Sequence, residues 1–124
     1  MNIEIERKFL VKQLPVNIEE TIYIKQYYLS NNKDMVQRLR IFNQEKAIIS
    51  FKQKTSNISK YEFEFNIPLD DANKMIEIID VPFINKKRHI ININSIKWEI
   101  DEFLDQNKGL IIAEVELKNE NQSI

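Results

Sequence analysis

The chain of 124 residues contains no cysteine, one glycine and one histidine. The lack of cysteine excludes disulfide frameworks, thiolate metal sites and cysteine nucleophiles. The single glycine, Gly109, excludes the glycine-rich loops that hold phosphates in Walker-type and dinucleotide-binding proteins. No apolar run approaches the length that crosses a membrane, and the early Glu4 and Glu6 do not fit a signal peptide. Several common functional classes are therefore excluded before any motif is considered.

An excess of one charge is also lacking, because 18 basic residues nearly balance 19 acidic ones. The formal net charge of -1 gives no general attraction to nucleic acid or to an anionic membrane. Hydrophobic residues make up 43% and charged residues 30%, a balance typical of soluble globular proteins and too apolar for disorder. We therefore expect one cytoplasmic domain over residues 1–124, with no nucleic-acid or membrane partner.

Runs rich in Ile, Phe, Tyr and Val predict eight strands, at about 2–10, 22–30, 36–42, 46–54, 60–67, 86–94, 96–104 and 110–118. Apolar residues at helical spacing predict a helix at about 70–80, which Asp70 or Asp71 can cap. A shorter helical turn is expected near 15–21. The fold class is therefore mainly β (α+β): eight antiparallel strands with one or two flanking helices. Eight strands favour a closed barrel or tunnel, because closure removes exposed sheet edges.

Charged and apolar residues alternate in many of these segments, beginning with Glu4-Ile5-Glu6-Arg7-Lys8. Because successive side chains on a strand point to opposite faces, the alternation places the charges on one common face. We call this set the charged wall. Its acids are Glu4, Glu6, Glu62, Glu64, Glu99, Asp101, Glu114 and Glu116. Its bases are Lys8, Arg38, Arg40, Lys52 and Arg88, with Lys54 and Lys86 as further candidates.

The composition of the charged wall suits phosphoryl transfer. Guanidinium groups bind phosphate oxygens in pairs, and lysines add point charges. Clustered carboxylates suit Mg²⁺ or Mn²⁺, which prefer oxygen ligands and often bridge to substrate phosphates. Together these groups could position a polyphosphate and a metal ion for attack by water. Alternation alone is equally compatible with an ordinary solvated sheet face.

The remaining polar and aromatic residues point to structural roles. His89 should face away from the charged wall, since it is adjacent to Arg88, and it lacks obvious partners for a catalytic triad. Most aromatic residues share the parity of the opposite face, which favours packing against helices over base stacking. Gln26 and Tyr28 share the parity of the charged wall and could support the lumen.

The ordered series of motifs resembles the CYTH superfamily, the triphosphate tunnel metalloenzymes. Glu4-Ile5-Glu6-Arg7-Lys8 resembles its ExExK signature, and the later landmarks follow in family order over residues 3–117. These landmarks are Gln26-Tyr27-Tyr28-Leu29, Arg38-Leu39-Arg40, Ser50-Phe51-Lys52, Glu62-Phe63-Glu64, Lys86-Lys87-Arg88, Trp98-Glu99-Ile100-Asp101-Glu102-Phe103 and Ala113-Glu114-Val115-Glu116-Leu117. One such motif would be weak, whereas eight in order are specific. Family members usually continue past this point into a C-terminal capping segment, which the present chain is expected to lack.

The resemblance implies an eight-stranded tunnel that holds a triphosphate-bearing substrate, and it implies a role for each part of the charged wall. The implied ligands of Mg²⁺ or Mn²⁺ are Glu4, Glu6, Glu114 and Glu116. Further acids that would orient metal, water or basic groups are Glu62, Glu64 and Asp101. The implied phosphate-binding residues are Lys8, Arg38, Arg40, Lys52 and Arg88, together with Lys86. The implied catalytic residues are Lys8, Glu4 and Glu6. The general base could be Lys8 or a carboxylate, or the metal-bound water could react without one.

The implied activity is metal-dependent hydrolysis of a triphosphate, with inorganic triphosphate as the first expectation and a homodimer as an expected assembly. The alternatives within the enzyme class are thiamine or nucleoside triphosphatase and class IV adenylyl cyclase. The alternative from another class is a polyphosphate- or nucleotide-binding module without turnover. The clustered carboxylates favour catalysis, because a pure anion binder has no use for them.

Overall fold

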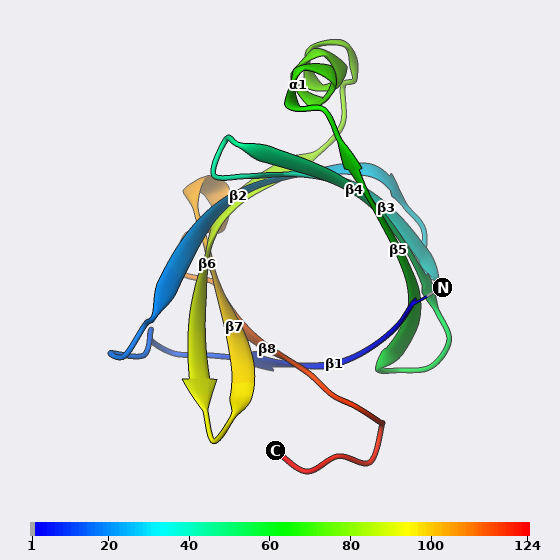
Figure 1. Cartoon of the computed structure of the whole chain (residues 1–124). Helices are drawn as coiled ribbons and strands as arrows, with labels where there is room; N and C mark the ends of the chain where they lie inside the picture. The colour runs from blue at the N-terminus through cyan, green and yellow to red at the C-terminus, as the bar shows by residue number, and fades with distance from the viewer. Residues whose placement is uncertain (1) are drawn as a thin grey trace.

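The computed structural model describes residues 2–124 and forms a closed antiparallel barrel with one outer helix (Figure 1). In chain order the elements are β1 (Asn2–Leu10), β2 (Glu20–Asn31), β3 (Met35–Phe42), β4 (Lys46–Lys54), β5 (Ser59–Ile67), α1 (Leu69–Ile78), β6 (Phe83–Ile93), β7 (Ile96–Phe103), the 3₁₀ turn η1 (Asp105–Asn107) and β8 (Ile111–Glu116). The order around the barrel is β1-β5-β4-β3-β2-β6-β7-β8. The predicted barrel and all eight predicted strands are confirmed.

One strand closes the barrel by pairing with a different neighbour along each half of its length. The first half of β1, from Asn2 to Ile5, pairs with β5. The second half, from Glu6 to Leu10, pairs with β8. Glu4 and Glu6 therefore lie at the seam where the strand changes partner, and closure of the barrel brings the first and last strands of the chain together.

Two tight turns adopt a left-handed backbone without glycine. Asn43 and Gln44, with φ of 51° and 58°, are the first two residues of the three-residue connection from β3 to β4, and Asn94 and Ser95, with φ of 52° and 64°, form the two-residue connection from β6 to β7. A two-residue hairpin such as β6–β7 favours this left-handed backbone, because its twist matches that of the flanking strands. Asparagine tolerates that backbone better than most residues, which explains its place at the start of both turns.

Helix α1 packs on the outside of the barrel, where it covers part of β3 and β4 (Figure 1). Ala72 on the helix is fully buried against Leu39 and Ile41 of β3 and Ala47 of β4. The helix confirms the prediction for 70–80, but the predicted cap is wrong. Pro68 occupies the N-cap position without a side-chain cap, and Asp70 and Asp71 lie in the first turn, where a carboxylate still interacts favourably with the helix dipole.

The second core lies between the barrel and the segment that follows β1. Val11 and Leu14 pack against a cluster formed by Ile91, Ile100 and Ala113. The helical turn predicted near 15–21 does not form: residues 15–19 are irregular, and the chain enters β2 at Glu20. Within residues 2–124, no helix is both long and apolar enough to cross a membrane.

Candidate functional site

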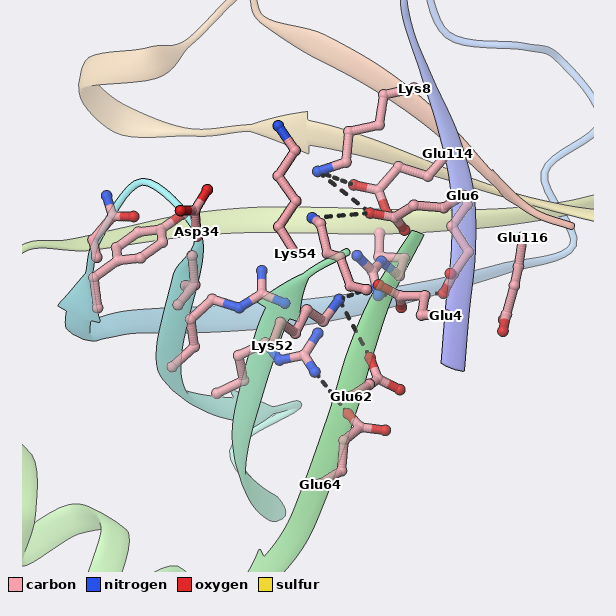
Figure 2. A pocket seen from close by; sticks show the side chains of 18 of the residues that line it. Glu4, Glu6, Lys8, Asp34, Lys52, Lys54, Glu62, Glu64, Glu114 and Glu116 are labelled. Atoms are coloured by element: carbon pink, nitrogen blue, oxygen red, sulfur yellow. Dashed lines mark hydrogen bonds and ion pairs between the residues drawn. The ribbon is translucent and has the colours of Figure 1, made fainter. Parts of the chain in front are cut away.

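A cavity of about 750 Å³ runs inside the barrel, and its lining comes from all eight strands (Figure 2). Most of its lining side chains are charged. Of the predicted site residues, the following line the cavity: Glu4, Glu6, Lys8, Tyr28, Arg38, Arg40, Lys52, Glu62, Glu64, Arg88, Glu114 and Glu116. The charged wall therefore faces the inside of the barrel. The alternative interpretation, an ordinary solvated outer face of the sheet, is wrong.

Three predicted residues share the inward parity but do not line the cavity. Gln26, Lys86 and Asp101 are buried and are absent from the described cavity lining. Gln26 donates a hydrogen bond to the Tyr28 hydroxyl at 2.7 Å, so this pair supports the lumen from within the wall. The aromatic residues that the sequence assigned to the outer face, such as Phe51, Phe63 and Trp98, are likewise absent from the described cavity lining.

Other lining residues were missed by the sequence reasoning. Val36 and Phe42 have the same parity as Arg38 and Arg40, and Lys97 has the same parity as Glu99, so alternation could have identified them. Asn31, Lys33, Asp34 and Asn57 lie at strand ends and in turns. Periodicity carries no signal at such positions, and only the closed barrel shows that they reach the cavity.

Lys52 occupies the centre of the densest ion-pair network in the cavity. Its Nζ lies 2.8 Å from Glu4 Oε1 and 3.3 Å from Glu62 Oε2. The register places Lys52 opposite Glu62 across β4 and β5, while Glu4 reaches it from β1. All three side chains are mostly buried. One lysine therefore pairs with a carboxylate from each of two neighbouring strands, β1 and β5.

Lys8 connects the acids of β1 and β8 in a looser arrangement. Its Nζ lies 3.5 Å from Glu6 Oε1 and 3.7 Å from Glu114 Oε1, as the dashed lines in Figure 2 show. Lys60 approaches the same Glu6 oxygen at 3.9 Å. Burial and the nearby Lys8 lower the pKa of Lys60. Unlike Lys52, Lys8 is half exposed, so it can move within the cavity.

The two arginines of β3 differ in their partners. Arg40 Nη2 donates a hydrogen bond to Glu64 Oε2 at 2.9 Å. Burial, together with the charges of Arg38 and Arg88, lowers the pKa of Arg40 to about 10. Among residues 2–124, no carboxylate forms an ion pair with Arg38, and its buried Nε has no hydrogen-bond partner. Arg38 thus presents an uncompensated cation to the cavity.

Arg88 is held by Asp101 through two hydrogen bonds. Its Nε donates to Asp101 Oδ1 at 2.9 Å and its Nη2 donates to Oδ2 at 3.0 Å. Although burial alone would raise the pKa of Asp101, hydrogen bonding from Arg88 and the charge of Lys86 lower it to about 2. Burial lowers the pKa of Lys86 to about 8, an effect that Asp101 partly offsets. Asp101 is therefore ionised at neutral pH.

Glu116 shows the opposite electrostatic environment. Burial and the charges of Glu4, Glu99 and Glu6 raise its pKa. In the part of the chain that the structure describes, no lysine or arginine forms an ion pair with it. Carboxylates so close to each other repel, and a cation placed between them would relieve that repulsion.

The donor chemistry of the cavity fits a divalent metal ion. Glu4, Glu6, Glu114 and Glu116 offer carboxylate oxygens, which Mg²⁺ and Mn²⁺ prefer. Over residues 2–124, no three acidic or histidine side chains converge closely enough to form a preassembled metal group. The ion pairs explain this, since lysines already hold Glu4, Glu6 and Glu114. A metal would therefore have to displace those lysines.

His89 lies outside this cavity, on the opposite face of β6, as the sequence predicted. It is buried, and its ring nitrogens lie 2.8 Å from Thr21 Oγ1 and 2.9 Å from Glu102 Oε1. The sequence analysis did not foresee these partners. They tie β2, β6 and β7 together, which is consistent with a structural role.

Comparison with known proteins gives consistent matches. The family model for the CYTH domain matches residues 2–124. An inorganic triphosphatase of Acetivibrio thermocellus is 37% identical over 123 residues, which cover 98% of this chain and 78% of the relative. The solved structure of the inorganic triphosphatase NE1496 is similar, with a TM-score of 0.66 and 24% identity over 97% of this chain and 77% of that chain. A putative adenylate cyclase from Bacillus halodurans has a TM-score of 0.74 and 16% identity, covering 97% of this chain and 84% of that chain.

Proposed function

The chain belongs to the CYTH domain family, and from this premise we propose that its tunnel hydrolyses inorganic triphosphate to pyrophosphate and phosphate. The observation that carries the proposal is the lining of the cavity, in which arginines and lysines face clustered carboxylates inside one closed barrel. The cations suit a polyanion and the carboxylates suit the divalent metal on which this family depends. Similarity to the triphosphatase of Acetivibrio thermocellus supports the choice of substrate.

We assign the residues of the cavity to two groups within this proposal. The phosphate-binding group consists of Lys8, Arg38, Arg40, Lys52 and Arg88. The metal-binding group consists of Glu4, Glu6, Glu114 and Glu116, with Mg²⁺ or Mn²⁺ as the ion. Glu62 and Glu64 orient Lys52 and Arg40, to which they are paired.

In the reaction, the oxygen of a water molecule attacks the terminal phosphorus, and the bond from that phosphorus to its bridging oxygen breaks. Pyrophosphate leaves with the bridging oxygen, and the proton of the water passes to a base. When bound, a divalent cation supplies charge neutralisation and acidifies a coordinated water. Arg38, Arg40 and Arg88 hold the phosphate oxygens in position, so that the charge developing on them meets fixed guanidinium groups. Lys8 belongs to the phosphate-binding group and also lies beside Glu6 and Glu114 of the metal-binding group.

Phosphate release from inorganic triphosphate tests the proposal directly. We expect release in Mg²⁺ or Mn²⁺, no release in EDTA, and slower release from ATP and pyrophosphate assayed in parallel. Release from ATP that exceeds release from triphosphate would favour a nucleoside triphosphatase, and formation of cyclic AMP would favour an adenylyl cyclase. If no substrate is hydrolysed while triphosphate still raises the melting temperature, the tunnel is a binding module and the proposal is wrong.

Replacement of Arg38 by methionine should raise the KM for triphosphate about tenfold to a hundredfold, since a hydrogen bond to a charged group contributes about 1.5–3 kcal/mol. The melting temperature should change little, because Arg38 makes no ion pair within residues 2–124. Steady-state kinetics and thermal unfolding measure the two effects. Lys87→Met, a change on the exposed face of β6, is the matched control. An unchanged KM would remove Arg38 from the phosphate-binding group.

A further inference from the structure

Asp101 is the most completely buried carboxylate among the residues that the structure describes, with 1% of its surface exposed. It lies on β7 opposite Arg88 of β6 and does not line the cavity. Both of its oxygens are occupied. Arg88 donates to Oδ1 and Oδ2 in a bidentate pair, and Lys86 Nζ lies 2.7 Å from Oδ2. A carboxylate in this position has no free approach from the cavity.

Lys86 is the second buried cation that pairs with Asp101. It is 3% exposed and does not line the cavity. Its Nζ lies 5.6 Å from the centre of the Phe103 ring, a distance at which the ring face attracts a cation. Lys86 is thus enclosed by Asp101 and an aromatic ring. Together with the hydrogen bonds from Arg88, its charge lowers the pKa of Asp101 and keeps that carboxylate ionised at neutral pH.

Arg88 connects the trio of Lys86, Asp101 and Arg88 to the cavity. Its Nη1 lies 3.2 Å from Glu99 Oε2, and Arg88 and Glu99 both line the cavity. Asp101 therefore fixes two of the three guanidinium nitrogens, Nε and Nη2, and the third points toward the lumen side. A guanidinium held in this way loses little rotational freedom when it binds phosphate, and it needs no rearrangement as charge develops on the phosphate oxygens.

We propose that Asp101 is a positioning residue that holds Arg88 ready for the phosphates, and that it is not a metal ligand. The proposal rests on the proposed function, since it names the part that this pair of strands plays in binding triphosphate. The sequence resemblance left open whether Asp101 orients metal, water or basic groups, and the proposal selects the basic groups. It also assigns Lys86 to the support of Asp101 instead of to direct phosphate contact.

The test compares the affinities of two ligands in Asp101→Asn and in the original protein. Calorimetry with inorganic triphosphate in EDTA gives the phosphate affinity without turnover, and electron paramagnetic resonance of free Mn²⁺ gives the metal affinity without substrate. We expect the Kd for triphosphate to rise about tenfold or more, while the Kd for Mn²⁺ stays within about twofold. In an Arg88→Met background, Asp101→Asn should cause no further loss of triphosphate affinity, because Asp101 acts through Arg88.

The matched control is Glu102→Gln, which makes the same carboxylate-to-amide change one residue later on β7, outside the described cavity lining. Should Asp101→Asn fail to fold, the double variant Asp101→Asn with Lys86→Met removes one of the two buried cations, and the same loss of triphosphate affinity is expected. An unchanged Kd for triphosphate, a loss of Mn²⁺ affinity, or an additive loss in the Arg88→Met background would each overturn the proposal. Turnover of triphosphate by the original protein is measured separately, so a failure of the proposed function would be seen independently.

Discussion

Replacement of Glu116 by glutamine should reduce metal-dependent phosphate release at least about a hundredfold and yet stabilise the metal-free protein at neutral pH. The loss of turnover follows from the loss of a carboxylate oxygen from the metal-binding group. The gain in stability follows from the raised pKa of Glu116, which reflects partial desolvation and repulsion by Glu4, Glu99 and Glu6. Glutamine keeps the shape of the side chain and removes its charge.

The pH dependence of this stabilisation has a definite sign. A carboxyl group whose pKa is higher in the folded than in the unfolded protein favours folding at low pH, and this contribution is lost as pH rises through the folded pKa. Glutamine corresponds to the protonated form at every pH. The variant should therefore melt at a higher temperature at neutral pH, and the difference should disappear below the ordinary glutamate pKa of 4.5.

Thermal unfolding in EDTA across this pH range measures the effect, and phosphate release in Mn²⁺ measures the loss of activity. Glu77→Gln is the control, since Glu77 lies exposed on α1 outside the barrel. In saturating Mn²⁺ the order of stability should reverse, because only the original protein has the complete carboxylate set. A variant that melts at a lower temperature than the original in EDTA at neutral pH would show that Glu116 is already neutralised in the metal-free tunnel.

The sequence was sufficient to predict the strands and most of the cavity because both depend on period-two alternation. Arg38 and Arg40, or Glu114 and Glu116, lie on the inner face for the same reason that the strand residues between them face outward. The prediction of the N-cap of α1 was wrong. Aspartate is a favourable cap residue, which pointed to Asp70 or Asp71, but the N-cap position is occupied by Pro68. Local residue preferences do not determine at which residue the chain enters the helix.

Alternation identifies a face but not the depth of a residue along the barrel. Asp101 and Glu99 have the same parity on β7, but only Glu99 lines the cavity. The difference comes from tertiary pairing, since Asp101 meets Arg88 across the strand pair and also Lys86. Likewise, the unpaired state of Arg38 and the pairing of Arg40 with Glu64 follow from side-chain reach, which periodicity does not describe.

Replacement of Lys52 by methionine should change two measurements in opposite directions. Turnover of triphosphate should fall about a hundredfold, because a buried phosphate-binding cation is lost. The affinity of the substrate-free protein for Mn²⁺ should rise about tenfold, which corresponds to about 1.4 kcal/mol. The reason for the second effect is that Lys52 holds Glu4 and Glu62, at 2.8 Å and 3.3 Å, and thereby competes with the metal for Glu4.

Lys54→Met is the matched control for this prediction. Lys54 lies two residues further along β4 and also lines the cavity, but it forms no ion pair within the described part of the chain. Its replacement removes the same charge without releasing a carboxylate, so Mn²⁺ affinity should change much less. An equal change in both variants would mean that only the overall charge of the cavity matters, and a decrease for Lys52→Met would show that the Lys52–Glu4 pair does not oppose metal binding.

The same ion pair predicts that metal and triphosphate bind cooperatively. Triphosphate can replace Glu4 and Glu62 as the partner of Lys52, which frees Glu4 for the metal, and the metal in turn frees Lys52 for the phosphates. Because such coupling is reciprocal, triphosphate should raise Mn²⁺ affinity by the factor by which Mn²⁺ raises triphosphate affinity. Lys52→Met removes this exchange, so the coupling should be smaller in Lys52→Met than in Lys54→Met when calorimetry uses a non-hydrolysable, methylene-bridged triphosphate analogue. Because Lys52 and Glu4 occupy each other in the empty tunnel, each ligand alone should bind more weakly than in the presence of the other.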